Sequence, residues 1–353
     1  MLMETKVLQL NTPSLYETAG EIVHRGGLVA FPTETVYGLG GDALNPVSSE
    51  RIYSAKGRPS DNPLIVHIAT RESLDLIVEE IPEVAEKLMD SFWPGPLTLV
   101  FRKKDVVPHA TTGGLGTVAV RYPSHPVARA FIEAAGGYIA APSANLSGRP
   151  SPTHSDHVIE DMMGRIDMII DGGDVGVMGL ESTIVDVSHE VPMLLRPGFI
   201  TLEMLERVVG EVQTDPVVRA RSVVEIRDVT PKAPGMKYRH YAPRADLRLY
   251  SGDNDRVVSA IVEEAESLTA RGLRVGIIAT DSNVTSYPTY CEVTSLGDVT
   301  DEWEIARRLF SVLRVFDGIG VDVILGETVR AEGVGLAIMN RLTKAAGYTI
   351  IDV

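Results

Sequence analysis

The chain has 353 residues, of which 44% are hydrophobic and 23% are charged. This composition is typical of globular proteins, and the length is sufficient for two domains. The formal net charge of −15 argues against a protein whose main task is gripping nucleic acid, because such proteins usually carry a basic balance. The single cysteine, Cys291, excludes an intramolecular disulfide, zinc fingers and Cys-x-x-Cys redox motifs. We see no signal peptide and no apolar run long enough to cross a bilayer, so we expect a cytoplasmic protein without membrane contact.

Residues 1–210 alternate strand-like and helix-like patterns, which predicts a twisted mixed sheet covered by helices. Thr201 is placed to cap the last of the predicted helices. The predicted strands are 28–31, 64–68, 97–101, 117–121, 168–170, 182–187 and 193–195, and the predicted helices are 48–55, 84–92, 126–135 and 202–209.

Residues 211–245 read as a linker, because charges, Pro231 and Pro234 interrupt any periodicity. Residues 246–353 alternate strands and helices again, which predicts a Rossmann-like three-layer α/β/α domain. It lacks Gly-x-Gly-x-x-Gly after its first strand, so we predict no dinucleotide there. The predicted strands are 247–250, 275–279, 321–325 and 348–351, and the predicted helices are 256–270, 301–316 (opened by a capping box of Asp301 and Glu304) and 336–345.

Two short motifs carry the strongest chemical signal. Lys56 and Arg58 flank a glycine just after a predicted helix, and a point-charge lysine beside a forked arginine suits phosphate oxygens. Ser143 and Asn145 follow a small apolar strand, where a hydroxyl and an amide can bind phosphate or ribose. Taken singly, each motif has an ordinary explanation as a solvated turn or an Asx turn. Together they indicate a triphosphate site built from loops.

Further polar residues gather at predicted strand ends and point to one cleft. Arg121 ends a strand and is placed for a carboxylate, whereas a lone strand histidine such as His67 is usually structural. We find no Ser-His-Asp arrangement and no metal-ligand cluster, so Mg²⁺ would arrive with a nucleotide and be held largely by it. The remaining candidates are the hydroxyls of Thr33, Thr35, Ser151 and Ser182 and the guanidinium of Arg196.

With these motifs in view, the chain resembles the YrdC/Sua5 family. Lys56-Gly-Arg58 with Ser143-Ala-Asn145 is similar to the family's Lys-x-Arg and Ser-x-Asn signature, and residues 32–39, 93–98 and 195–198 match it too. Residues 234–243 and the domain after them resemble the long, two-domain Sua5 form. The resemblance implies a YrdC-like first domain (1–210), a linker acting as a lid (211–245) and a Sua5 C-terminal domain (246–353).

The resemblance also implies an activity. The family makes L-threonylcarbamoyladenylate and pyrophosphate from L-threonine, bicarbonate and ATP, for N6-threonylcarbamoyladenosine next to the anticodon of tRNAs that read ANN codons. A downstream KEOPS-type transferase and tRNA would be indirect partners. By this resemblance Lys56, Arg58, Ser143 and Asn145 are catalytic; they bind ATP with Asn62, Thr117, Ser151, Arg196 and the lid residues Tyr238, His240 and Tyr241; and Thr33, Thr35, His67, Arg121, Ala141 and Ser182 hold threonine.

Two rival functions compete with this one. Carbamoyltransferases that mature hydrogenases share a related domain, but they carry cysteine-rich zinc fingers, which a chain with Cys291 alone cannot build. A non-enzymatic RNA-binding module would need a local basic patch, and the net charge of −15 weakens that hypothesis without removing it.

Overall fold

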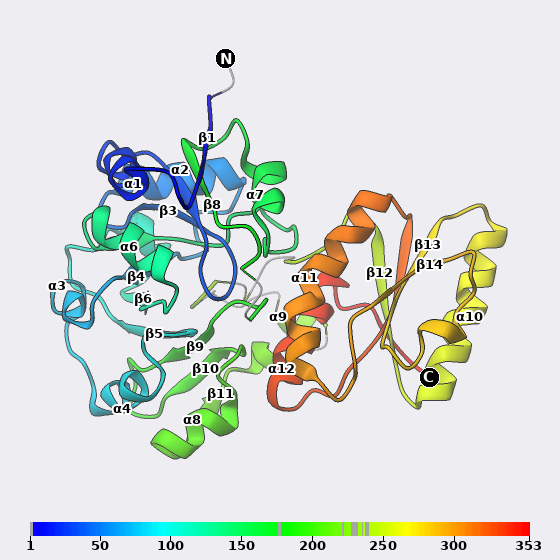
Figure 1. The fold of residues 1–353 in the computed structure, drawn as a ribbon. Helices are drawn as coiled ribbons and strands as arrows, with labels where there is room; N and C mark the ends of the chain where they lie inside the picture. The colour runs from blue at the N-terminus through cyan, green and yellow to red at the C-terminus, as the bar shows by residue number, and fades with distance from the viewer. Residues whose placement is uncertain (1–2, 176–177, 221, 227–231, 235, 237–239) are drawn as a thin grey trace. The chain divides into compact units, whose positions relative to one another are not determined.

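The computed structural model describes residues 3–175, 178–220, 222–226, 232–234, 236 and 240–353 (Figure 1). Contacts between residues divide the chain into two compact units. The first unit comprises Met1–Ser147, Ser151–Arg219 and Asp228–Lys237, and the second comprises Gly148–Pro150, Ala220–Arg227 and Tyr238–Val353. The domain boundaries drawn from sequence at residues 210 and 245 stay predictions.

The first unit is built on a mixed sheet. The described strands follow the order β1-β8-β2-β3-β7-β4-β6-β5-β9-β10-β11, with parallel and antiparallel pairs intermingled. Their bounds are β1 Lys6–Gln9, β2 Val29–Phe31, β3 Gly38–Asp42, β4 Ile65–Ile68, β5 Leu97–Arg102, β6 Thr117–Arg121, β7 Tyr138–Ala140, β8 Met168–Asp171, β9 Thr183–Asp186, β10 Met193–Arg196 and β11 Gln213–Thr214.

Helices bury both faces of this sheet. The described residues of the first unit form two hydrophobic cores. Along β2, Ala30 packs in the larger core, while Val29 and Phe31 pack in the second core together with α1 and α6. Side chains alternate along a strand, so a strand covered on both faces has to be apolar throughout. The helices of this unit are α1 Leu15–His24, α2 Pro46–Lys56, α3 Leu74–Ile77, α4 Glu83–Phe92, α5 His109–Thr112, α6 Pro126–Ala134, α7 Ser155–Met162 and α8 Leu202–Val209, with 3₁₀ turns at Arg71–Ser73 and Pro216–Arg219.

The second unit is a parallel sheet with helices on both faces. The strand order is β14-β13-β15-β12-β16, with α10 on one face and α11 and α12 on the other (Figure 1). This confirms the predicted Rossmann-like, three-layer architecture. The bounds are α9 Val223–Ile226, β12 Asp246–Ser251, α10 Asn254–Ala270, β13 Val275–Ala279, β14 Glu292–Ser295, α11 Glu302–Ile319, β15 Val323–Glu327, α12 Gly333–Ala345 and β16 Ile350–Asp352, with a 3₁₀ turn at Val284–Ser286.

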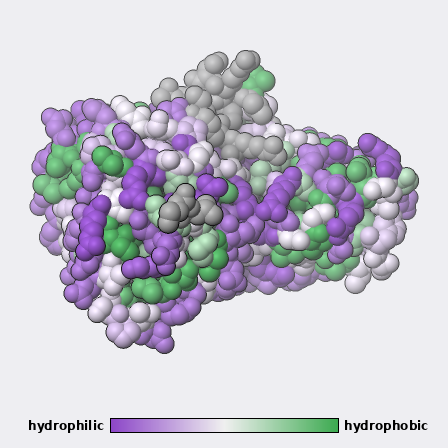
Figure 2. Space-filling view, turned by 90° about the horizontal axis from the view of Figure 1, so that it is seen from above, coloured by the Kyte–Doolittle hydropathy of each residue, from purple (hydrophilic) through white to green (hydrophobic). Residues whose placement is uncertain are grey.

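Both predicted N-cap residues are confirmed, but the reciprocal bond of the capping box is not formed, because the Asp301 amide donates to the Asp298 carbonyl at 2.9 Å. The Thr201 hydroxyl accepts a hydrogen bond from the Met204 amide at 3.3 Å, and the Asp301 carboxylate accepts one from the Glu304 amide at 3.0 Å. Strands β1, β3, β11 and β14 and helices α1, α3, α5, α7 and α9 have no counterpart in the sequence prediction. On the face shown in Figure 2, hydrophilic residues surround smaller hydrophobic patches on each unit.

Candidate active site

The register of the first sheet places several of the candidate residues in one row. His67 on β4 lies opposite Arg121 on β6, and Arg121 lies opposite Thr98 on β5. Residues opposite each other across a strand pair point to the same face. The row continues through Ile184 on β9, which is opposite both Thr98 and Arg196.

This row lies on the face of the sheet turned away from the larger core. The neighbours of His67 and Arg121 along their strands, Val66, Ile68 and Val120, belong to that core. Because side chains alternate, His67 and Arg121 point to the opposite face. The same alternation places Ser182 on the side of Ile184. Residues far apart in sequence thereby meet on one surface.

Lys56 fixes the loop that carries Ser143 and Asn145. It is the last residue of α2, and Gly57 caps that helix in the left-handed region (φ 63°). The buried Lys56 ammonium donates to the backbone carbonyls of Ser143 and Asn145, both at 2.5 Å. The Ser143 hydroxyl donates to Asn145 Oδ1 at 2.5 Å. The two motifs of the sequence signature are therefore in direct contact.

Arg58 holds its own loop. Its Nη2 donates to the carbonyls of Asn62 and Pro63 at 3.2 and 2.9 Å. The Asn62 side chain is buried, and its Oδ1 accepts no hydrogen bond from the described residues. An amide oxygen without a donor is a polar group that a ligand can satisfy.

Ser151 reaches a carboxylate. Its hydroxyl donates to Glu181 Oε1 at 2.5 Å, and both residues are buried. The signature loop also runs beside the segment after β2, because the Ala144 amide donates to the Tyr37 carbonyl and the Tyr37 amide donates to the Pro152 carbonyl. The loop is thus fixed on both sides.

The side-chain hydroxyls of Thr33 and Thr35, both predicted to contact the substrate, form a chain of hydrogen bonds with Arg121. Arg121 Nη1 donates to Thr35 Oγ1 at 2.9 Å, and the two hydroxyls lie 2.9 Å apart. Thr33 donates its proton to the Val36 carbonyl at 2.7 Å. Thr35 must therefore be the donor between the two hydroxyls, which fixes the direction of this chain from Arg121 to Val36.

Arg121 also pairs with a buried carboxylate of the protein. Its Nη2 lies 2.7 Å from Glu34 Oε1, and both side chains are at most 6% exposed. Burial raises the pKa of Glu34, but the charge and hydrogen bond of Arg121 and further hydrogen bonds leave that pKa below its usual value. The carboxyl is therefore ionised at neutral pH.

His67 is held neutral. Its Nδ1 lies 3.1 Å from the Ile65 carbonyl, which fixes the ring. Burial, followed by the nearby Arg121 charge, lowers the pKa of His67 to about 3. At neutral pH the imidazole adds no charge to the site and offers hydrogen bonding only.

Ser182 and Arg196 form the far end of the row. The Ser182 hydroxyl lies 2.7 Å from Thr98 Oγ1 and accepts from Arg196 Nη2 at 3.1 Å. Arg196 Nη1 also donates to the carbonyl of Pro234, at 3.5 Å. The predicted threonine contact Ser182 and the predicted ATP contact Arg196 are therefore neighbours.

Two other candidates occupy backbone-rich positions. The Ala141 amide donates to the Ile65 carbonyl at 2.9 Å, directly before the signature loop. Thr117 begins β6 and Arg121 ends it, so the two lie roughly 13 Å apart along the strand. The structure thus separates Thr117 from Arg121.

The predicted lid residues fall in the second unit or outside the described residues. Tyr238 lies outside the described residues. His240 packs against Tyr241, with ring centroids 5.4 Å apart. Tyr241 has a positive φ of 65° and stacks on Phe310 of α11 at 5.2 Å, with the Arg341 guanidinium 5.8 Å from its ring centroid. Tyr241 is therefore part of the packing of the second unit.

Sequence reasoning missed three residues of this site as functional candidates: Glu34, Thr98 and Glu181. Glu34 stands between the two candidate threonines, which was the available signal, and Glu181 directly precedes Ser182. The first unit buries the cations Lys56, Arg58, Arg121 and Arg196 and the carboxylates Glu34, Asp161 and Glu181, in a chain of net charge −15. Fixed cations of this kind suit an anionic ligand.

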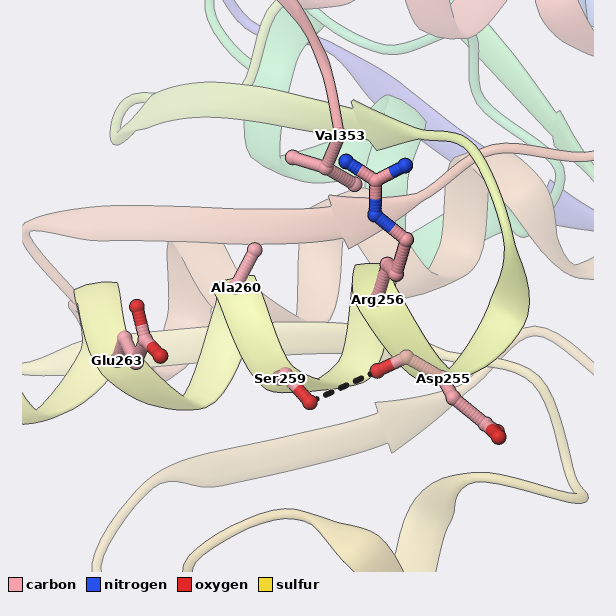
Figure 3. Close-up of a pocket in the computed structure, with 6 residues that line it drawn as sticks. All are labelled: Asp255, Arg256, Ser259, Ala260, Glu263 and Val353. Carbon is pink, nitrogen blue, oxygen red and sulfur yellow. Dashed lines mark hydrogen bonds between the residues drawn. The ribbon is translucent and has the colours of Figure 1, made fainter.

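A shallow pocket on the second unit offers less chemistry. It lies along α10 beside Val353 and is shown in Figure 3. The Asp255, Arg256 and Glu263 side chains are exposed, and the Ser259 hydroxyl donates to the Asp255 carbonyl at 2.8 Å. Among the described residues, no helix is long and apolar enough to cross a membrane, and no group of three or more His, Cys, Asp or Glu side chains could hold a metal ion.

Comparisons with known proteins match the chain over most of its length. A family model described as "Telomere recombination" (Sua5, YciO and YrdC) matches residues 21–198, and one described as "Threonylcarbamoyl-AMP synthase, C-terminal domain" matches residues 200–347. The chain is 52% identical over 335 residues to a threonylcarbamoyl-AMP synthase of Pyrococcus abyssi, covering 95% of each chain. It belongs to the Sua5 family.

The likeness to Sua5 proteins extends over both units. A threonylcarbamoyl-AMP synthase of Bacillus subtilis is 45% identical over 348 residues, covering 98% of this chain and 97% of the relative. The crystal structure of P. abyssi Sua5 complexed with L-threonine matches with a TM-score of 0.90 at 49% identity, covering 99% of each chain. The two-domain Sua5 architecture predicted from sequence is thereby confirmed.

Proposed function

We infer that this chain is a threonylcarbamoyl-AMP synthase, which makes threonylcarbamoyl-AMP and pyrophosphate from L-threonine, bicarbonate and ATP. Full-length relatives of this name at 45–52% identity support the inference. The observation that carries it is the pairing of two polar clusters in one unit. One joins Lys56 to the loop of Ser143 and Asn145, and the other joins Arg121 to Thr35.

The chemistry needs no nucleophile from the protein. The amine of threonine attacks CO₂ derived from bicarbonate and gives a carbamate. A carbamate oxygen then attacks the α-phosphorus of ATP, a new P–O bond forms, and pyrophosphate leaves. The enzyme is on this account a nucleotidyltransferase, and its catalysis is mostly positioning and charge neutralisation.

The cluster around Lys56 is the proposed ATP site. Lys56 and Arg58 supply fixed positive charge, and the buried Asn62 offers an amide oxygen that a ligand can satisfy. The Lys56 ammonium already holds two backbone carbonyls, so it organises the loop as well as the field around it. The proposed ATP contacts are completed by Ser143, Asn145, Ser151, Arg196 and Thr117.

The cluster around Arg121 is the proposed threonine site. A guanidinium takes a carboxylate through two parallel hydrogen bonds. The hydroxyls of Thr33, Thr35 and Ser182 and the neutral imidazole of His67 provide uncharged partners around it. A crystal structure of the P. abyssi Sua5 complexed with L-threonine supports an amino-acid ligand for this fold.

Mg²⁺ is proposed as the metal that accompanies ATP. The described residues contain no group of three or more His, Cys, Asp or Glu side chains suited to a metal ion. The donors for Mg²⁺ would thus be phosphate oxygens and water, as is usual for this ion. When bound with the nucleotide, it would neutralise charge on the phosphates.

Two further proposals concern the surroundings of the reaction. The carbamate is labile in water, so a lid formed by residues 237–241 would protect it. The product would pass to a KEOPS-type transferase for modification of tRNA. The net charge of −15 and the polar side chains of the two clusters favour this enzyme over an RNA-binding module. Salt-dependent RNA binding without ATP turnover would instead indicate the RNA-binding module.

The test is pyrophosphate release by the purified chain. Release should require ATP, L-threonine and bicarbonate together, and Lys56→Ala should abolish it. Lys87→Ala is the matched control, because Lys87 is an exposed lysine that pairs with Glu83 on α4. Release that does not depend on threonine would contradict the proposed function.

A further inference from the structure

The Glu34 carboxylate has one oxygen engaged and one oxygen free. Oε1 lies 2.7 Å from Arg121 Nη2 and accepts a hydrogen bond from the Ser124 amide at 3.2 Å. Oε2 is buried and accepts no hydrogen bond from the described residues. The whole residue is only 4% exposed. An ionised oxygen left without a donor in the interior is costly, so a donor from a ligand would satisfy it.

The groups that face Glu34 do not supply that donor. Arg121 is committed to Oε1, and the nearby His67 is neutral because burial lowers its pKa to about 3. Burial also lowers the pKa of His125, whose charged form the Glu34 carboxylate would favour. The His125 Nδ1 is itself buried without a hydrogen-bond partner among the described residues. The site therefore holds a negative charge with one unused acceptor.

Arg121 has N–H donors that the protein does not use. A guanidinium carries five N–H donors. Nε donates to the Gly95 carbonyl at 3.4 Å and Nη1 donates to Thr35 Oγ1 at 2.9 Å. Nη2 lies 2.7 Å from Glu34 Oε1 as an ion pair but makes no hydrogen bond with the described residues. At least one N–H therefore remains on each terminal nitrogen, which is the arrangement that binds a carboxylate with two hydrogen bonds.

We propose that Glu34 is a substrate-binding residue that accepts the α-ammonium group of threonine, while Arg121 takes the α-carboxylate. The buried pair then presents one positive and one negative pole to a ligand that carries both. This inference rests on the proposed function, since it names the ammonium contact of the same threonine site. It also gives the pair a selective role, because a ligand without an amine would leave the free oxygen unsatisfied.

The test compares two ligands on two proteins. Calorimetry would measure the affinity of wild type and Glu34→Gln for L-threonine and for 3-hydroxybutyrate, which lacks the amine. Glutamine keeps the size of the side chain and removes its charge. We expect the variant to lose roughly tenfold or more in threonine affinity. Its affinity for 3-hydroxybutyrate should stay within about twofold or improve, since the positive pole is unopposed.

Three controls keep the result interpretable. Glu83→Gln removes an exposed carboxylate on α4 and should leave both affinities unchanged. Circular dichroism would check that Glu34→Gln is folded. If it is not, Glu34→Asp keeps the charge with a shorter reach, and it should weaken threonine while sparing 3-hydroxybutyrate.

Equal weakening of both ligands would mean that Glu34 acts only by orienting Arg121, and it would overturn the proposal. Unchanged threonine affinity would overturn it as well. Failure of the proposed function looks different, because the wild-type protein would then bind no threonine and release no threonine-dependent pyrophosphate.

Discussion

At the residue scale, Arg121 combines a stability role with a binding role. The sequence placed it for a ligand carboxylate, and the structure adds a carboxylate of the protein itself, Glu34, at 2.7 Å. Breaking a buried ion pair from one side leaves the other charge uncompensated. Loss of activity on replacing Arg121 therefore has two possible sources, and stability has to be measured beside it.

Arg121→Ala should lower the free energy of unfolding by about 3–5 kcal/mol, because Glu34 would remain charged and buried. Urea unfolding at pH 7 measures this. The double variant Arg121→Ala with Glu34→Ala should be less destabilised than Arg121→Ala alone. Equal denaturation midpoints for Arg121→Ala and wild type would show that the pair is not buried as described.

His67 gives the first unit a pH-dependent stability term. Its folded pKa of about 3 lies below the ordinary value of 6.5, so the unfolded chain binds more protons between these two values. The contribution is fully present above pH 6.5 and is lost as the pH falls toward 3. Wild type should lose about 2 kcal/mol more stability than His67→Asn between pH 7 and pH 5. Parallel pH curves for the two proteins would contradict this prediction.

At the scale of elements, the end of α2 positions the two signature cations. Gly57 caps this helix with φ of 63°, and a Cβ added there would meet nothing within 4 Å. A substitution therefore acts through the backbone alone, without a clash. Gly272, which follows α10 in the second unit with φ of 83° and the same open surroundings, is a natural match.

Gly57→Ala and Gly272→Ala should each cost about 1–2 kcal/mol of stability, because alanine disfavours the left-handed region. Only Gly57→Ala should also raise the KM for ATP, since it shifts Lys56 relative to Arg58. Steady-state kinetics at saturating threonine would check this. An equal change of the KM for ATP in both variants would show that the effect does not arise at the nucleotide site, and it would contradict the prediction.

The sequence predicted apolar strands well and glycine-rich ones poorly. Strands β4 and β6 follow from hydrophobic runs, whereas β3 reads Gly-Leu-Gly-Gly-Asp and has low strand propensity. Its Gly40 is required by close packing, since a Cβ there would lie 2.8 Å from the Ile139 side chain and 3.0 Å from Phe31. Such a contact between distant segments leaves no local signal.

The site was predictable only in part, because local patterns can be read from the sequence and contacts between distant segments cannot. The motif of Lys56 and Arg58 and that of Ser143 and Asn145 were recognisable as local patterns. The pairing of Glu34 with Arg121 joins residues far apart in the chain, and only the folded sheet brings them together.

At the scale of the whole molecule, the linker divides between the two units. In the first unit, the Pro234 carbonyl accepts a hydrogen bond from Arg196 Nη1 at 3.5 Å. Tyr241 packs in the second unit between Phe310 and Arg341.

Tyr241→Ala should destabilise the second unit by about 3–5 kcal/mol, as expected for a buried aromatic residue. Tyr238→Ala should instead lower turnover without a matching loss of stability, if residues 237–241 close over the reaction as predicted from the sequence. Urea unfolding and pyrophosphate release on the same samples separate the two effects. Lost stability with normal turnover in Tyr238→Ala would contradict the lid.

On the proposed function, this chain joins threonine, CO₂ and AMP in one product. The most direct test is mass spectrometry of the reaction with ¹³C-labelled bicarbonate and L-threonine. We predict an AMP adduct that carries both threonine and a single ¹³C, formed with an equal amount of pyrophosphate and missing in Lys56→Ala. Pyrophosphate released without such an adduct, or an adduct that carries no ¹³C, would contradict the account.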